Sequence, residues 1–269
     1  MKSELIVHER PKSNVSEDIR TIRTNLQFTA SKDKSKVILI TSSIQGEGKS
    51  FISSNLAVAF AQNGEKTLLI DSDLRLGRAH KIFNISNKFG LSNLLVNYEE
   101  SDIRDYIAST TIKNLYVIPR GIVCPNPSEL LNSDTTKKMI EFLKNKFDHI
   151  IFDGVPINGL PDSLILANLV DRVVIVSSCN YTKIDELDAT KKALQKINAP
   201  IAGVIMNKAP QTKRGKYSSI LLDPSSKSYK ICECISVIFH LLIIRRIFAS
   251  LSLRCFIHNN TSYRCIYFL

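Results

Sequence analysis

Residues 37–50 read VILITSSIQGEGKS, an aliphatic run that stops at a glycine-containing loop ending in Gly48, Lys49 and Ser50. A strand that passes through such a loop into a helix directs several backbone N–H groups, and the positive end of the helix dipole, at one point. Lys49 is placed to reach terminal phosphates, and the Ser50 hydroxyl is placed to ligate Mg2+. The stretch therefore predicts a polyphosphate site.

The loop departs from the common pattern G-x-x-x-x-G-K-[ST], because Ser43 replaces its first glycine. Gly46 and Gly48 remain, and they still allow the backbone to curl closely around an anion. The alternative interpretation is an ordinary strand-to-helix turn with a solvated lysine. The following residues favour the phosphate site, since residues 51–61 have the apolar spacing of a helix that Gly64 would end.

Two further aliphatic runs end in acidic residues. Residues 66–75, KTLLIDSDLR, deliver Asp71 and Asp73, and residues 147–153, FDHIIFD, deliver Asp153. Ligands of open α/β sheets bind beyond the carboxyl ends of the strands, so these carboxylates are expected to face the same cleft as Lys49. Asp153 has the position of a Walker B acid, which binds Mg2+ or orients Ser50. The alternative for Asp71 and Asp73 is a helix cap with a solvated neighbour.

The rest of the first 217 residues alternates between strand and helix patterns. Ser16 is the expected capping residue of the first helix, after an exposed lead-in that runs from Met1 to about Asn14. Further segments are predicted as strands at 114–119, 171–177 and 201–207, and as helices at 16–28, 134–146 and 184–197. The alternation predicts an α/β fold with a mostly parallel sheet and helices on both of its faces.

Composition limits the possibilities without choosing among them. The 269 residues are 44% hydrophobic and carry a formal net charge of +11, which permits an anionic partner such as phosphates, a membrane surface or nucleic acid. The six cysteines show neither metal-binding spacing nor a dense disulfide framework, and no apolar leader opens the sequence. A reducing, cytoplasmic location is expected.

Four motifs between about Ser16 and Tyr217 resemble those of the bacterial tyrosine kinases of capsular and exopolysaccharide synthesis, which are related to partition and division-site ATPases. Their phosphate loop has the form [AST]-x-x-P-G-x-G-K-[ST], which accounts for Ser43, although Gln45 stands here in place of the proline. The motif D-x-D-x-R matches residues 71–75, and D-x-x-P matches residues 153–156. The motif E-x-x-R-x-x-R matches Glu17, Arg20 and Arg23.

The resemblance implies a P-loop NTPase fold with a deviant Walker A loop, and transfer of a phosphoryl group from ATP to protein tyrosines, including tyrosines at the enzyme's own C-terminus. It implies catalytic roles for Lys49, Asp71 and Asp73, with Asp71 as the proton acceptor. The ATP contacts would be Gly46, Glu47, Gly48, Lys49, Ser50, Phe51 and Asn207, the last of them at the adenine. The Mg2+ ligands would be Ser50, Asp73 and Asp153. Contacts between subunits of a homo-oligomer would use Glu17, Arg20 and Arg23.

The same resemblance implies partners and a location. The expected partner is a transmembrane activator of the polysaccharide chain-length regulator type, which recruits the cytoplasmic kinase to the inner face of the plasma membrane; no nucleic acid is expected. Two other functions stay open, namely a partition or positioning ATPase switched by nucleotide, and an ATP-binding regulatory module without phosphotransfer. Against the first, residues 41–44, TSSI, lack the second lysine that such ATPases usually carry.

Residues 218–269 depart from the family pattern, so the kinase domain is expected to comprise residues 1–217. This tail holds four of the six cysteines and one apolar run, residues 235–244, which is too short to span a bilayer that requires about twenty residues. A frameshifted or poorly ordered end is one hypothesis, with impaired autophosphorylation as its consequence. A native tail at a membrane interface is the other. The remaining acceptor candidates are Tyr217, Tyr229, Tyr263 and Tyr267.

Overall fold

The computed structural model of the chain describes residues 4–28, 36–209 and 266–268. These residues form an eight-stranded sheet with the order β3-β4-β2-β5-β1-β6-β7-β8. The strands are β1 (Val37–Ser42), β2 (Thr67–Asp71), β3 (Ala108–Ser109), β4 (Leu115–Ile118), β5 (His149–Pro156), β6 (Arg172–Ser178), β7 (Ile201–Asn207) and β8 (Ile266–Phe268). Neighbours from β4 to β7 pair in parallel, whereas β3 and β8 pair antiparallel at the two edges.

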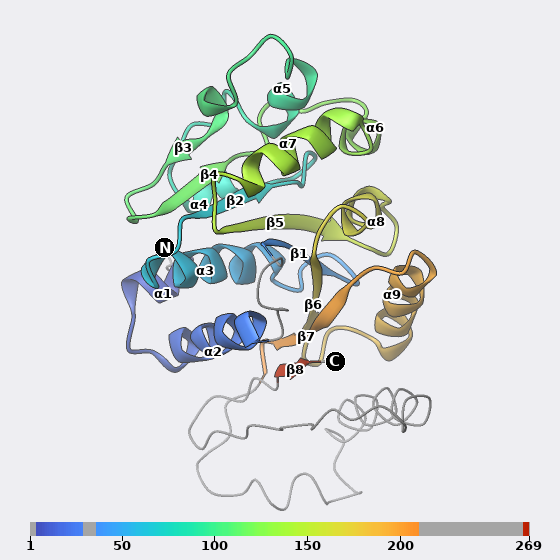
Figure 1. Cartoon of the computed structure of the whole chain (residues 1–269). Coiled ribbons are helices and arrows are strands. Elements are labelled where there is room, and N and C mark those ends of the chain that lie inside the picture. Colours follow the sequence, from blue (N-terminus) through green and yellow to red (C-terminus); the bar gives the residue numbers. More distant parts are fainter. Residues whose placement is uncertain (1–3, 29–35, 210–265, 269) are drawn as a thin grey trace, which may run out of the picture. The chain divides into compact units, whose positions relative to one another are not determined.

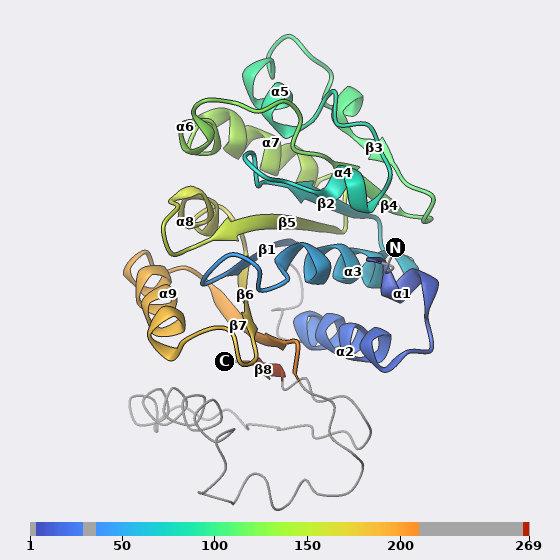
Figure 2. The same ribbon diagram turned by 180° about the vertical axis from the view of Figure 1, so that it is seen from behind.

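Helices cover both faces of this sheet (Figure 1). One face packs against α1 (Ile6–Glu9), α2 (Asn14–Phe28), α3 (Lys49–Gln62) and α4 (Ala79–Ile82). The other packs against α5 (Leu91–Val96), the 3-10 helix η1 (Ile103–Tyr106), α6 (Pro127–Leu131), α7 (Asp134–Lys144), α8 (Asp162–Ala167) and α9 (Ile184–Lys196). Seen from behind, α2 and α3 again lie on the side opposite α8 and α9 (Figure 2). The predicted fold class is confirmed.

Alternation along the central strands explains why both faces are apolar. In β1, Val37 and Leu39 belong to one core cluster and Ile38 and Ile40 to the other, and all four are buried. A parallel strand that is buried on both faces is expected to have a continuous aliphatic sequence. The first four residues of β1, Val37 to Ile40, have such a sequence. The helix α3 is likewise buried from Ile52 to Ala61, because it lies between the sheet and α2.

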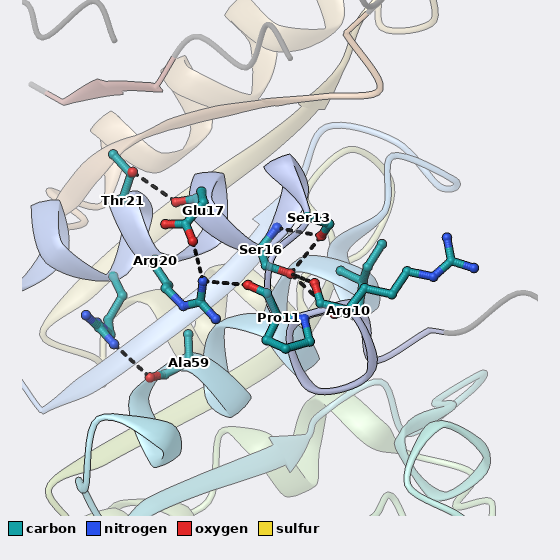
Figure 3. Close-up of polar contacts among 10 residues, drawn as sticks. Arg10, Pro11, Ser13, Ser16, Glu17, Arg20, Thr21 and Ala59 are labelled. Carbon is teal, nitrogen blue, oxygen red and sulfur yellow. Dashed lines mark hydrogen bonds and ion pairs between the residues drawn. The ribbon is translucent and has the colours of Figure 1, made fainter. Parts of the chain in front are cut away.

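The prediction for the N-terminal segment is wrong in part. Residues 8–12 are exposed as expected, but residues 6–9 form α1, which packs on α3 with Val7 fully buried. The predicted cap Ser16 lies inside α2, which begins at Asn14, while the Ser13 hydroxyl accepts a hydrogen bond from the Ser16 backbone N–H at 3.2 Å. The Ser16 hydroxyl instead donates to the carbonyl oxygen of Arg10 at 2.7 Å (Figure 3). Local spacing could not reveal this packing.

Two predictions concern parts of the chain that the structure hardly describes. The proposed domain boundary near Tyr217 and three of the four candidate acceptor tyrosines lie outside the described residues. Of the predicted tail, the structure describes the three residues of β8, whose backbone pairs with β7 through Gly203, Val204 and Ile205. The nature of this tail stays a prediction.

We expect Asn55→Ala to lower the free energy of unfolding by about 2 kcal/mol, because its side chain fixes α1 to α3. Its Oδ1 accepts from the Val7 N–H at 3.0 Å, and its Nδ2 donates to the Glu4 carbonyl oxygen at 2.7 Å. Urea unfolding measures the loss, and amide hydrogen exchange at Val7 reports its site. The control is Gln62→Ala at an exposed position of the same helix. Equal losses in the two variants would contradict this role of Asn55.

Candidate functional site

The loop between β1 and α3 turns through two glycines into the start of a helix, as the sequence predicts. Gly46 and Gly48 have φ angles of +85° and +97°, in the left-handed region that favours glycine. Gly48 immediately precedes the first residue of α3, Lys49. The N–H groups of the first turn of a helix have no partner within the helix, so this end of α3 attracts anions.

A buried carboxylate holds the loop in place. Glu47 is fully buried, and its Oε2 accepts from the Ile44 N–H at 2.7 Å. Its Oε1 accepts from the N–H of Ser178, the last residue of β6, at 3.3 Å and from the hydroxyl of Thr182, which follows the strand. The Glu47 side chain thus ties the loop to the neighbouring strand. The contact of Glu47 with the nucleotide stays a prediction. It would have to use the Glu47 backbone, because both side-chain oxygens already accept hydrogen bonds within the chain.

Asn207 supports the same loop from the end of β7. Its Nδ2 donates to the Glu47 carbonyl oxygen at 2.8 Å, and its Oδ1 accepts from the Lys208 N–H at 2.9 Å. A Cβ atom at Gly48 would lie 2.2 Å from this Nδ2. Glycine is therefore required at position 48 both by its φ angle and by the space available. The predicted contact of Asn207 with adenine stays a prediction.

Lys49 lies inside the loop with its side chain almost buried. It is 8% exposed, and its Nζ donates to the Ser42 hydroxyl at 3.0 Å. Desolvation lowers the pKa of Lys49, while the negative charges of Asp153, Glu47 and Asp73 act in the opposite direction. The Lys49 ammonium group thus lies close enough to Asp153 and Asp73, two of the three predicted acids, to be attracted by their charges.

Asp71 and Asp153 lie side by side in the sheet, but Asp153 does not end its strand as predicted, because β5 continues to Pro156. Asp71 of β2 and Asp153 of β5 are register partners, and both are buried. Desolvation raises the pKa of Asp153 to about 6, against hydrogen bonds from Ser50 and Ser53 and the charge of Lys49. Desolvation, followed by the charge of Asp153, raises the pKa of Asp71 well above its ordinary value. Two carboxylates this close disfavour each other's ionisation.

One oxygen of each of these carboxyl groups is unsatisfied. The Oδ1 atoms of Asp71 and Asp153 are buried and have no hydrogen-bond partner within the described part of the chain. Such groups are costly unless a ligand or ion pairs with them. In the described ranges, no group of three or more His, Cys, Asp or Glu residues could hold a metal ion alone. The donors present fit Mg2+, which commonly takes one or two carboxylates, phosphate oxygens and water.

Asp73 and Gly77 shape the turn that follows β2. The half-buried Asp73 accepts through Oδ1 from the Leu76 N–H at 2.8 Å and the Arg75 N–H at 3.2 Å. Gly77 lies directly over Asp71, because a Cβ atom there would be 2.4 Å from its Oδ1. The turn consequently exposes Asp73 and covers Asp71.

The predicted oligomer contacts lie apart from this loop, on α2. Glu17 is exposed, and it accepts from the Arg20 guanidinium at 2.6 Å. Arg20 also donates to the Pro11 carbonyl oxygen at 2.8 Å (Figure 3), and Arg23 donates to the Ala59 carbonyl oxygen at 3.0 Å. All three residues have partners within the chain, and their role between subunits stays a prediction.

Sequence reasoning missed the residues that close the loop from the β6 and β7 side. Lys208 donates through Nζ to the Gly46 carbonyl oxygen at 2.7 Å, and the Tyr181 hydroxyl donates to the Gln45 carbonyl oxygen at 3.2 Å. The Lys208 ammonium group also lies 5.4 Å from the centre of the Tyr181 ring. These residues are separated from the loop by more than 130 positions, and no local pattern distinguishes them.

The sheet order, the glycine loop and the strand-terminal acids define a phosphate-loop NTPase. The model of the AAA domain family matches residues 35–205. The putative tyrosine-protein kinase CapB of Staphylococcus aureus is 39% identical over 215 residues, covering 80% of this chain and 93% of the relative. Tyrosine-protein kinase YwqD of Bacillus subtilis (strain 168) is 38% identical over 217 residues, covering 81% and 91%.

Solved structures agree with these relatives. The crystal structure of the chimerical protein CapA2B2 superposes with a TM-score of 0.74 at 40% identity, covering 78% of this chain and 92% of that one. The chain belongs to the family of bacterial tyrosine-protein kinases that includes CapB and YwqD, within the AAA domain family.

We expect Gly48→Ala to lower the free energy of unfolding by about 3 kcal/mol, because it combines an unfavourable φ angle with the clash against Asn207. Gly64→Ala is the matched control, since Gly64 has a φ of +94° but open space around its Cα. That variant should lose only about 1 kcal/mol. In a double-mutant cycle with Asn207→Ala, the two losses should not add. Additive losses would show that there is no clash.

The raised pKa of Asp153 predicts a pH-dependent stability in the absence of nucleotide. The folded protein keeps this proton up to about pH 6, whereas the ordinary pKa is 3.8. Between these values the unfolded state binds fewer protons, so the free energy of unfolding falls as pH rises. Asp153→Asn removes this pH-dependent fall in the free energy of unfolding, because asparagine does not titrate. Relative to wild type, the variant should therefore gain about 1–2 kcal/mol between pH 4 and pH 7.

Urea unfolding of the nucleotide-free protein at several pH values provides the measurement. Asp105→Asn, at an exposed position of η1, is the control whose difference from wild type should not change with pH. A constant difference for Asp153→Asn would show that Asp153 ionises normally in the folded protein.

Proposed function

We propose that the chain is an ATP-dependent protein-tyrosine kinase that phosphorylates itself and other proteins and regulates the synthesis and export of capsular or extracellular polysaccharide. The observation that carries the proposal is the pair of buried, unsatisfied carboxyl groups of Asp71 and Asp153 beside the phosphate loop. Membership of the tyrosine-kinase family supports the same conclusion.

The chain's own residues supply the positioning and the charge for phosphoryl transfer. The N–H groups around Gly46, Gly48 and the first turn of α3 would hold the phosphates, with Lys49 neutralising their charge. Ser50 and Asp153 would hold Mg2+, and Asp73 would support it. When bound, Mg2+ supplies charge neutralisation between the phosphates of ATP.

Asp71 is the proposed proton acceptor for the tyrosine hydroxyl. Its raised pKa suits a group that takes up a proton near neutral pH. Because Asp71 lies beneath Gly77, we propose that Gly77 and Arg78 move aside when a tyrosine binds. The part of the turn before Gly77 is fixed, since Leu74 is buried in the core and the Arg75 carbonyl oxygen accepts from Arg120.

Assembly and location follow from the family. We propose that Glu17, Arg20 and Arg23 contact a neighbouring subunit, which would present its tyrosines to this site. A transmembrane adaptor of the polysaccharide chain-length regulator type would hold the kinase at the inner face of the plasma membrane. Within the described ranges, no helix has both the length and the apolar character needed to cross a bilayer.

Lys49→Met should reduce tyrosine phosphorylation by about a hundredfold or more, because it removes the cation that stabilises charge on the transferred phosphoryl group. Incubation with labelled ATP, Mg2+ and a tyrosine-containing substrate provides the measurement. Lys192→Met, on the exposed face of α9, is the control and should retain full activity. ATP hydrolysis without any phosphotyrosine in the wild type would instead identify a nucleotide-switched ATPase.

A further inference from the structure

An exposed apolar surface lies beside the predicted acids, at the carboxyl ends of β2 and β4. Leu76, Ile122 and Val123 are 64%, 58% and 66% exposed, respectively. The two segments that carry them are in contact, because the Arg120 guanidinium donates to the Arg75 carbonyl oxygen. Leu76, Arg120, Ile122 and Val123 are called the shelf below.

The shelf lies beside the end of β2, which carries Asp71. Ile70 of β2 pairs with Ile118 of β4, and Asp71 and Arg120 follow this pair by one and two residues on adjacent strands. On the other flank of the shelf, the Leu76 N–H donates to the Asp73 carboxylate at 2.8 Å. A peptide on the shelf would therefore lie next to both acids.

The backbone of the shelf is fixed by the start of α5. The Leu91 N–H donates to the Pro119 carbonyl oxygen at 2.7 Å, and the Ser92 N–H donates to the Arg120 carbonyl oxygen at 2.9 Å. The Ser92 hydroxyl donates to the Ile122 carbonyl oxygen at 2.7 Å. Exposed apolar side chains on a backbone held by this many hydrogen bonds form a preorganised surface, which lowers the entropy lost on binding.

Arg120 gives the shelf a positive charge that the chain does not neutralise. Among the described residues its hydrogen bond goes to an uncharged carbonyl oxygen, no carboxylate lies within ion-pair distance, and its buried Nε has no partner. Desolvation and then the charge of Arg120 lower the pKa of His80. A half-buried guanidinium with spare donors is suited to bind a carboxylate.

The opposite side of the loop uses its polar groups on the loop itself, although the Tyr181 side chain is 54% exposed there. There Tyr181 and Lys208 donate to the loop carbonyl oxygens of Gln45 and Gly46, and Thr182 binds Glu47. An acceptor approaching from the β2 and β4 side meets Asp73 first, because Asp73 is the half-buried member of the three acids.

We propose that the shelf binds the acceptor peptide, with Arg120 selecting an acidic residue beside the tyrosine and Leu76, Ile122 and Val123 contacting its apolar neighbours. This inference rests on the proposed kinase function and names the substrate class of the same site. The occupant is a peptide that combines a tyrosine with acidic and apolar residues.

Binding of fluorescein-labelled peptides to the full chain, measured by anisotropy, tests the proposal independently of catalysis. One peptide has glutamates on both sides of a single tyrosine, and the other has glutamines in their place. The wild type should bind the glutamate peptide roughly tenfold more tightly. Arg120→Gln should abolish that preference while leaving binding of the glutamine peptide unchanged. Arg120→Lys, which keeps the charge, should retain part of it.

The control variant is Arg104→Gln, which removes an exposed guanidinium elsewhere on the chain and should behave as wild type. Equal binding of both peptides by the wild type, or a loss in Arg120→Gln that is the same for both peptides, would overturn the proposal. The same peptides with Mg2+ and ATP test the kinase function separately. If the wild type prefers the glutamate peptide but forms no phosphotyrosine, the kinase function is refuted and the acidic-peptide site stands. If it phosphorylates both peptides without preferring either, the kinase function stands and the acidic-peptide site is refuted.

Discussion

The repulsion between two buried carboxyl groups, Asp71 and Asp153, is the constraint on which this site depends. Parallel pairing of β2 with β5 places them level with one another. Both are removed from water, which raises both pKa values, and the charge of Asp153 raises that of Asp71 further. A cation bound there would favour the ionised forms, so its binding would release protons and become stronger as pH rises.

The helix α3 connects this site to the N-terminal segment of the chain. Its first residues supply the end of the phosphate loop, and Asn55, about one and a half turns further on, holds the backbone of α1. At the level of the following turn, the Ala59 carbonyl oxygen accepts from Arg23 of α2. Because α3 is buried along most of its length, these contacts join the phosphate loop to the helix that carries Glu17, Arg20 and Arg23.

The sequence predicted those features that local patterns control. Aliphatic runs predicted the central strands, the glycine at position 64 predicted the end of α3, and Asp71 ends β2 as predicted, whereas Asp153 lies three residues before the end of β5. The sequence did not predict features that depend on contacts between residues far apart in the chain. Nothing near Val7 indicates that Asn55 is its partner, and the ties from Glu47 to Ser178 and Thr182 join residues more than 130 positions apart. Strands as short as β3 and β8 have no periodicity to detect, since two or three residues do not establish an alternation.

The two sides of the phosphate loop differ in a way that gives the site a direction. On the β6 and β7 side, Glu47, Asn207 and Lys208 use their polar atoms on the loop itself, so that side serves to hold its shape. On the β2 and β4 side, Asp73 is half-buried, and Arg120 has no counter-ion among the described residues. In the proposed kinase, the second reactant would approach from the β2 and β4 side, where these groups have hydrogen-bonding capacity left. This asymmetry follows from the order of the strands, because β2 and β4 lie on one side of β1 in the sheet and β6 and β7 lie on the other.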